Sequence, residues 1–148
     1  MLLFVALAVN AAPVRPRSEI MGVGLDMSRD DAQARLKTFA TLEKDDRKRQ
    51  EVWALKDSRF SHLLVGYDAE NRVRYVTAIA RADGPRMRYQ DVADPKGARH
   101  TVNQGNHKFT WEVSARGGHF AYILIARGRD PQYLDSYSVK KADQEEID

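Results

Sequence analysis

Asp94, His100 and His107 are the side chains of this sequence best suited to bind a metal ion. They lie in residues 93–107, which are rich in glycine and asparagine and are therefore predicted to form a loop. Imidazole nitrogens and carboxylate oxygens both bind zinc, so a loop that brought the three together would create a metal site. Exposed or hydrogen-bonded structural histidines explain the same residues without a metal, and we favour that interpretation. Cysteine is absent, which excludes thiolate ligands, disulfides and a cysteine nucleophile.

The carboxylates of the sequence do not form a recognisable catalytic pattern. Several stand at predicted turns or strand ends, where such side chains usually accept hydrogen bonds from backbone amides; they are Asp68, Asp91, Asp94 and Asp130. Neither a nucleophile elbow (G-x-S-x-G) nor an H-E-x-x-H motif occurs. We therefore predict no catalytic residue, no cofactor and no enzymatic activity. The alternative is a small-molecule or metal-binding domain, enzymatic or not, around Asp94, His100 and His107.

Arginine and aromatic side chains recur along the predicted strands and are the candidates for an interaction surface. An Arg-x-Arg-Tyr pattern occurs at residues 72–75 and again at residues 86–89. Together these arginines would form a face for anionic ligands, although strands with solvent-facing arginines produce the same pattern. Aromatic residues and arginine dominate interface energetics. The candidate interaction residues are Trp53, Tyr67, Arg72, Arg74, Tyr75, Arg86, Arg88 and Tyr89.

Composition narrows the class of protein. The 148 residues suit one domain, and 43% hydrophobic with 30% charged residues is typical of a globular chain. The net charge of +3 is less concentrated than in most nucleic-acid-binding domains, so we predict no nucleic-acid partner. No apolar run approaches the roughly 18 residues that a membrane-spanning helix needs, so we predict no transmembrane span.

The two ends of the chain differ from its middle. Residues 2–9 are apolar and are followed by Asn10-Ala11-Ala12-Pro13, which resembles a signal peptide with its cleavage site. We predict a signal peptide over 1–11, a linker over 12–19, one domain over 20–139 and a charged, frayed tail over 140–148. The protein would then be periplasmic or secreted. The alternative for the first segment is a strand or helix of the core.

The best local signal of secondary structure is a helix that begins after Ser28. Serine is a favoured N-cap, and an acidic residue three positions later, here Asp31, completes a pattern similar to a capping box. Apolar residues then follow at helical spacing, at Ala32, Leu36 and residues 39–40. These spacings predict one amphipathic helix of about three turns. Residues 43–50 contain no apolar side chain and are expected to be its solvated end or a loop.

Strand patterns dominate the rest of the chain. Alternating polar and apolar residues predict strands over 51–56, 61–67, 72–80, 86–92, 108–116 and 119–126. A hairpin turn at Gly117-Gly118 would pair Val113 with Tyr122 and Trp111 with Leu124, which places the apolar side chains on one face. The predicted fold class is α+β: one N-terminal amphipathic helix packed on a meandering antiparallel sheet of five to seven strands.

Some of the predicted strands are apolar on both sides. Between residues 119 and 126, for example, Leu124 points one way and Ile125 the other. Such a strand needs cover on both faces. One helix covers one face, so the second face is to be covered by other parts of the chain or by a partner, including a second copy in a homodimer. We expect the chain to cover itself.

Residues 20–79 resemble the SmpA/OmlA family of small envelope domains, whose general fold is shared by the β-lactamase inhibitor protein. The residues that carry the resemblance are Gly24, Met27-Ser28, Leu36, Trp53, Leu64-Val65-Gly66-Tyr67-Asp68 and Val73. The resemblance implies a helical segment followed by an antiparallel sheet, and a protein that binds other proteins without catalysis or cofactor. The expected function is a non-catalytic, exported interaction module whose partner is a protein or an anionic envelope polymer.

Overall fold

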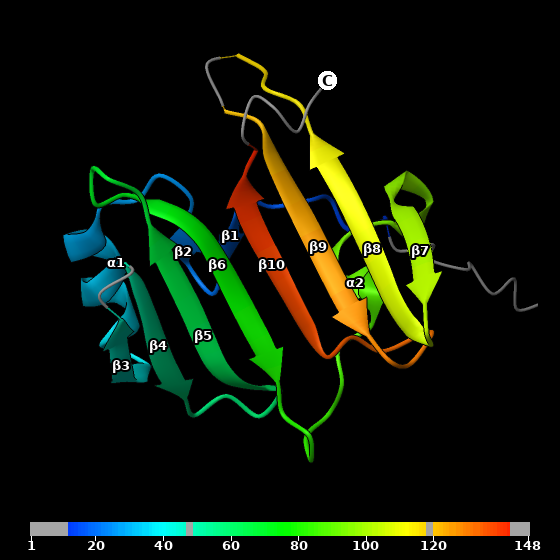
Figure 1. The fold of residues 1–148 in the computed structure, drawn as a ribbon, viewed down its shortest axis with the longest axis horizontal. Helices are drawn as coiled ribbons and strands as arrows, with labels where there is room; N and C mark the ends of the chain where they lie inside the picture. Colours follow the sequence, from blue (N-terminus) through cyan, green and yellow to red (C-terminus); the bar gives the residue numbers. More distant parts are fainter. Residues whose placement is uncertain (1–11, 47–48, 118–119, 143–148) are drawn as a thin grey trace, which may run out of the picture.

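An eight-stranded antiparallel sheet forms the body of the computed structural model, which describes residues 12–46, 49–117 and 120–142 (Figure 1). Its strands are β3 (Ala40–Asp46), β4 (Gln50–Leu55), β5 (Phe60–Tyr67), β6 (Val73–Ala80), β7 (Arg99–Asn103), β8 (Asn106–Val113), β9 (Tyr122–Gly128) and β10 (Ser136–Lys141). The smaller elements are the two-stranded ribbon β1 (Glu19–Ile20) and β2 (Val23–Gly24), the helices α1 (Arg29–Leu36) and α2 (Tyr89–Val92), and the 3-10 turn η1 (Pro95–Gly97).

The sheet consists of two four-stranded meanders that meet at their last strands. The strand order is β3-β4-β5-β6-β10-β9-β8-β7, so β10 lies between β6 and β9. β6 and β10 pair antiparallel, with Val76 opposite Val139 near the middle of the sheet. A short helix precedes each meander, α1 before β3–β6 and α2 before β7–β10. The two halves of the chain therefore repeat one plan, a short helix followed by four strands.

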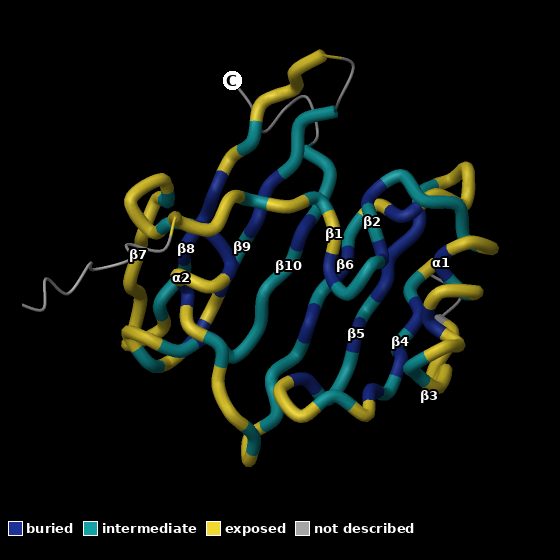
Figure 2. Tube along the Cα trace, turned by 180° about the vertical axis from the view of Figure 1, so that it is seen from behind, coloured by how far each residue is buried: buried dark blue, intermediate teal, exposed yellow. Residues whose placement is uncertain are grey.

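All of these small elements lie against the same face of the sheet, which we call the covered face (Figure 2). Its core side chains come from both meanders and from the elements above them. The largest fully buried ones include Ile20, Leu36, Trp53, Phe60, Leu63, Val65, Val76, Leu134 and Val139. No described helix or strand lies on the opposite face, which we call the open face (Figure 1). The expected self-coverage of this second face is thus not seen in the described part of the chain.

The predicted fold class is wrong. Strand dominates the structure, the sheet has eight strands rather than five to seven, and it is not a single meander because β10 inserts between β6 and β9. The helix is also shorter than predicted and ends at Leu36, so it covers only one end of the sheet. Residues 39–40, which fit the helical spacing, lead into β3 instead. Helical period alone could not tell a third turn from a strand that starts there.

Both edge strands were missed, for one physical reason. β3 covers the first half of the segment expected to be a helix end or loop, and β7 lies within the predicted loop 93–107. Every residue of β7 is exposed, as is Leu42 in β3. Edge strands often carry polar and charged side chains on both faces, which blunts edge-to-edge association. A strand without a buried face has no alternation for the sequence to reveal.

The predicted strand over 86–92 is wrong as well, because residues 89–92 form α2. Tyr89 and Val92 are buried from this short helix at a spacing of three residues. The carboxylate of Asp91 accepts a hydrogen bond from the backbone N–H of Arg88 at 3.1 Å, which stabilises the start of the turn.

Several local predictions are confirmed. The Ser28 hydroxyl accepts a hydrogen bond from the Asp31 backbone N–H at 3.2 Å, as an N-cap should. Strands β4, β5 and β6 match three predicted strands within one residue at each end. In the predicted hairpin, Val113 pairs with Tyr122 and Trp111 pairs with Leu124.

The ends of the chain are described only in part. The predicted signal peptide, residues 1–11, and most of the predicted tail lie outside the described residues. The expected linker contacts the domain, since the Val14 carbonyl accepts from the Asp94 N–H and the Pro16 carbonyl accepts from the Tyr122 hydroxyl. Lys140 and Lys141 belong to β10 rather than to a frayed end. Among the described residues, no helix is both long and apolar enough to cross a membrane.

Candidate functional site

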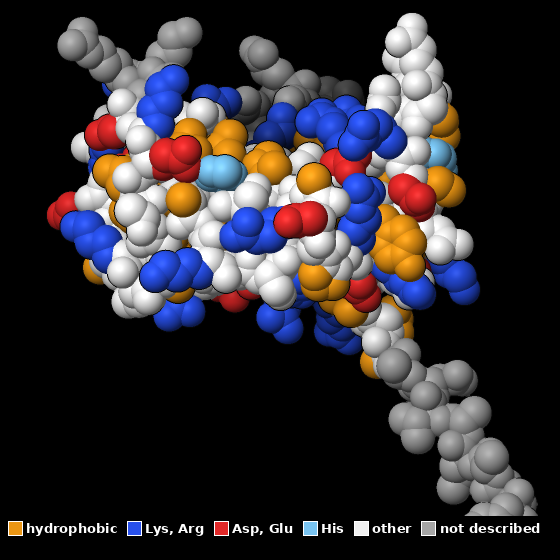
Figure 3. All heavy atoms as spheres, turned by 90° about the horizontal axis from the view of Figure 1, so that it is seen from below, with side chains coloured by type: hydrophobic (Ala, Val, Ile, Leu, Met, Phe, Trp, Pro, Cys, Tyr) orange, Lys and Arg blue, Asp and Glu red, His pale blue; other side chains and the backbone are white. Residues whose placement is uncertain are grey.

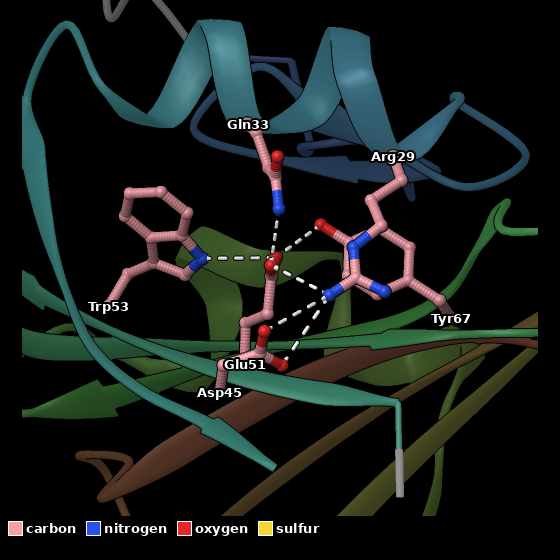
Figure 4. Close-up of polar contacts among 6 residues, drawn as sticks. All are labelled: Arg29, Gln33, Asp45, Glu51, Trp53 and Tyr67. Atoms are coloured by element: carbon pink, nitrogen blue, oxygen red, sulfur yellow. Dashed lines mark hydrogen bonds and ion pairs between the residues drawn. The ribbon is translucent and has the colours of Figure 1, made fainter. Parts of the chain in front are cut away.

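Glu51 is a completely buried carboxylate between α1 and the sheet (Figure 4). Its Oε1 accepts hydrogen bonds from the Tyr67 hydroxyl at 2.6 Å and from Trp53 Nε1 at 3.3 Å. Its Oε2 accepts from Gln33 Nε2 at 2.5 Å and from Arg29 Nη2 at 3.3 Å. Each oxygen therefore has two donors, and one of the four, Arg29, is cationic, which is the arrangement that makes a buried carboxylate tolerable.

Three elements bring these donors together. Arg29 and Gln33 are four residues apart on α1 and so point from the same side of the helix. Glu51 and Trp53 are two residues apart on β4 and so lie on one face of the sheet. Tyr67 reaches the carboxylate from the end of β5.

Arg29 links the buried carboxylate to the surface. Its Nη2 also lies 3.4 Å from both carboxylate oxygens of Asp45, whose side chain is about half exposed. Its guanidinium stacks over the ring of Tyr67, with 5.0 Å between the guanidinium carbon and the ring centre. Arg29 therefore shares its charge between one buried and one solvated acid.

The Glu51 cluster holds structure together, and its central carboxylate is sealed from solvent. A buried carboxylate with strongly interacting neighbours is a common feature of active sites. Glu51, however, has no exposed surface, and its oxygens are all occupied by protein donors. Burial, followed by the hydrogen bond to Glu51, raises the pKa of the Tyr67 hydroxyl far above its ordinary value, so this group stays a proton donor. The cluster therefore fixes α1 to β4 and β5.

The second half of the chain solves the same packing problem without a charge. Trp111 on β8 corresponds to Trp53 on β4, and the residue two positions before it is Phe109 instead of Glu51. The ring of Phe109 packs against Tyr89 of α2, with 4.3 Å between ring centres. An apolar contact between helix and sheet is thus sufficient for this architecture. The buried carboxylate of the first half is therefore not required by the fold.

The predicted metal ligands are only partly brought together. His100 Nε2 lies 3.0 Å from His107 Nδ1, across the edge pair of strands β7 and β8. Asp94 does not join them, because its carboxylate accepts from the Lys96 backbone N–H at 3.0 Å and caps η1. Residues 12–46, 49–117 and 120–142 contain no group of three or more histidine, cysteine, aspartate or glutamate side chains able to hold a metal. His100 also stacks on the ring of Phe109.

The predicted interaction aromatics lie mostly in the core. Trp53, Tyr67 and Tyr89 are 2%, 5% and 3% exposed, so none of them offers a surface to a partner. Tyr75 differs: it lies on the open face, opposite Gly66 in the neighbouring strand, and its hydroxyl donates to the Gln50 side chain. A Cβ at Gly66 would overlap the Tyr75 ring. The aromatic side chain thus covers a glycine, a pairing known to stabilise sheets.

The predicted arginines do not form one cationic surface. Arg72 and Arg74 lie at the beginning of β6, whereas Arg86 and Arg88 lie beyond its end. Arg72 donates to the Asp26 carbonyl at 3.0 Å. Arg86 pairs with Asp135 at 3.5 Å, and Arg88 lies over the ring of Tyr133 at 5.6 Å.

The largest feature outside the predicted site residues is the open face. Strand pairing places a row of half-buried side chains across five strands: Val52, Leu64, Thr77, Ser138 and Ile125. At its centre the Thr77 and Ser138 hydroxyl oxygens are 2.7 Å apart. Figure 3 views the molecule from below, with the open face at its upper side, where hydrophobic side chains lie among Lys and Arg side chains. Only the two-sided apolar character of strands such as β9 pointed to this surface.

Acidic side chains on the open face are already paired. Glu43 lies 2.8 Å from the ring nitrogen of His62, and Glu112 lies 3.6 Å from Arg99. In contrast, Lys108 and Arg127 stand directly opposite each other on β8 and β9. Within the described residues, neither of these two cations has a carboxylate partner. The part of the open face formed by β8 and β9 therefore carries unbalanced positive charge.

No family model, curated protein or solved structure gives a significant match to this chain. The resemblance to the SmpA/OmlA family and to the fold of the β-lactamase inhibitor protein therefore stays a prediction.

Proposed function

We propose that this chain is a non-catalytic binding module that holds a protein partner on the open face of its sheet. One observation carries the proposal: a sheet of eight strands has its small elements on a single face, and the other face presents apolar side chains such as Leu64 and Ile125. Val52, Leu64 and Ile125 are partly exposed there, and apolar side chains grouped on an uncovered face are a feature of interaction sites.

A folded protein suits this face better than a charged polymer. Interfaces between proteins combine an apolar centre with a polar rim. Here Val52, Leu64 and Ile125 flank two hydroxyl groups, and charged side chains lie towards the ends of the sheet. An anionic envelope polymer would instead favour a continuous cationic track, and the arginine pairs lie at opposite ends of β6.

The charge of the face specifies the partner further. Glu43 and Glu112 are neutralised within the face, whereas Lys108 and Arg127, side by side on β8 and β9, have no carboxylate partner among the described residues. Complementary potentials steer association and select partners. We therefore expect an acidic surface on the partner. The signal-peptide pattern of the sequence supports a further part of the proposal, that the module acts in the periplasm or after secretion.

A photo-crosslinking amino acid placed on the open face is expected to capture the partner. A benzophenone amino acid at position 77 or 138, in the native host, should form an adduct with one protein, because both positions lie at the centre of the face. The same amino acid at Asp30 or Lys37, exposed on or next to α1, should not form it. Adducts only from α1 would contradict the proposal, and adducts with a second copy of the chain would identify a homodimer instead.

Affinity for the captured partner tests the same face quantitatively. Thr77→Glu introduces a charge at the centre of the open face and should weaken binding about tenfold or more, which corresponds to ~1.4 kcal/mol. Thr38→Glu makes the same change on the exposed residue that follows α1 and should leave the affinity unchanged. Equal affinities of the two variants, with unchanged melting temperatures, would exclude the open face.

A second candidate function rests on the two histidines. A tetrahedral metal bound by two imidazoles at about 2.0–2.1 Å from each holds their nitrogens about 3.3–3.4 Å apart, and the 3.0 Å hydrogen bond between His100 and His107 brings the two nitrogens close to that separation. Calorimetric titration with nickel or zinc should then give heat that His100→Gln abolishes. His62→Gln, on another strand, is the matched control. Absence of heat from the unmodified protein would remove this candidate.

A further inference from the structure

A hollow of about 390 Å³ lies on the open face near the sheet edge formed by β7, beside the turn that joins β7 to β8. Its walls include the two unbalanced cations, Lys108 and Arg127, together with Thr101 and Asn103 from β7. We infer that this hollow is a subsite for a compact oxyanion, and that the proposed partner fills it with an acidic side chain. The assignment of the oxyanion to the partner rests on the proposed function, whereas the existence of the subsite does not.

The register of the strands brings the cations together. Thr101 pairs with Lys108, and Lys108 pairs with Arg127, so the three side chains form one row across β7, β8 and β9. On the far side of Arg127 the next residue in the row is Ser136 of β10. The two cations therefore lie side by side between two hydroxyl-bearing residues, on the face that has no cover.

Electrostatics favours an anion at this position. Like charges directly opposite each other in an antiparallel pair are destabilising, and the described residues provide no acid that pairs with Lys108 or Arg127. Asp135 does line the hollow, but its carboxylate already pairs with Arg86 at 3.5 Å and with Arg129 Nε at 3.4 Å. An oxyanion between the two cations would relieve their repulsion.

The donors around the hollow fit an oxyanion in number and kind. An arginine guanidinium binds carboxylate or phosphate with two parallel hydrogen bonds, and lysine adds a compact positive charge. Asn103, Gln104 and Asn106 line the same hollow with amide groups. The volume of about 390 Å³ holds a small oxyanion with several waters, at ~30 Å³ for each water.

The rim of the hollow is a tight turn. Gln104 and Gly105 both have positive φ angles, 50° and 77°, as the two central residues of a type I′ hairpin turn do. This backbone positions Asn103 and Asn106 as direct partners at the end of the ladder. A turn of this kind holds its flanking side chains in place before a ligand arrives.

The test is a titration of the full chain at constant ionic strength. Backbone amide signals in NMR spectra monitor the binding. The probes are inorganic phosphate, a hexaglutamate peptide and a hexaglutamine peptide as the neutral control. Saturable shifts that centre on Thr101, Lys108 and Arg127 are expected with hexaglutamate and not with hexaglutamine. The double variant Lys108→Gln/Arg127→Gln should weaken this binding about tenfold or more. Arg15→Gln/Lys37→Gln removes the same charge from exposed positions elsewhere and should not.

The arms of the experiment separate the outcomes. Saturation by phosphate alone supports the subsite but assigns it to a free oxyanion rather than to an acidic side chain. Shifts that do not saturate, or that both double variants reduce equally, overturn the subsite, because general screening then explains them. If the titration fails but crosslinking from position 77 succeeds, the proposed binding module stands and the oxyanion subsite is contradicted. If the titration saturates but crosslinking fails, the subsite is supported and the proposed protein partner is contradicted.

Discussion

Replacement of Glu51 by glutamine is expected to destabilise the folded chain by about 3–5 kcal/mol, the usual cost of removing one partner from a buried ion pair. The amide of glutamine would keep one oxygen for two of the four donors. Its NH₂ group would face the other two, and one of those two, either Trp53 Nε1 or Arg29 Nη2, can only donate and would lose its acceptor. Arg29 would also lose its buried counterion.

Asp45→Asn is the matched control for this prediction. Asp45 contacts the same guanidinium as Glu51 does, at 3.4 Å, but its side chain is 53% exposed. Exposed ion pairs contribute about 0–1 kcal/mol, so the loss should be small. Denaturant unfolding of both variants measures the difference. Similar, small losses in the two variants would contradict the structural role assigned to Glu51.

A combined variant asks whether the charge is needed at all. Arg29→Met, Glu51→Leu and Tyr67→Phe together replace the charged and hydroxyl groups with apolar ones, in imitation of the contact between Phe109 and Tyr89 in the second half. Apolar replacement of a whole buried ion pair is often neutral or stabilising. The combined variant should therefore be more stable than Glu51→Gln alone.

Replacement of Gly128 by alanine is expected to destabilise the chain by about 1–3 kcal/mol, because the added methyl group overfills a packed junction. An added Cβ would lie 2.5 Å from the Tyr133 carbonyl oxygen and 3.1 Å from the Leu134 Cα, and it would also meet the Tyr89 hydroxyl. Two of these neighbours are backbone atoms, which cannot rotate away as a side chain can. The connection that leads into β10 would have to move.

Gly97→Ala provides the comparison for Gly128→Ala. The nearest atom to a Cβ at Gly97 would be Trp111 Cδ1 at 3.8 Å, an ordinary contact distance. Surface changes of this kind usually stay within about 0.5 kcal/mol. Thermal unfolding followed by circular dichroism measures both variants. Equal melting temperatures would mean that the junction around Gly128 relaxes easily.

The sequence predicted those parts of the fold that have a buried face. The cap at Ser28 and the pairing of Val113 with Tyr122 follow from local chemistry and from alternation, and both are confirmed. The edge strands β3 and β7 have no buried face to reveal them. The insertion of β10 between β6 and β9 depends on contacts between residues far apart in the chain, which no local pattern encodes.

The candidate site was harder to predict than the fold. His100 and His107 approach each other because β7 and β8 pair, yet the loop prediction for that segment concealed the pairing. Glu51 reads as an ordinary polar position on an alternating strand, and only the arrival of α1 makes it buried. The neighbouring cations Lys108 and Arg127 are nineteen positions apart, so only the register of β8 and β9 brings them together.

The meeting of the two meanders at β6 and β10 has a consequence for biosynthesis. β10 is the last strand of the described chain, and until it has been made β6 presents an unpaired edge. Such an edge is a template for association with other chains. The sheet cannot close during early translation, and its long-range pairings favour slow folding.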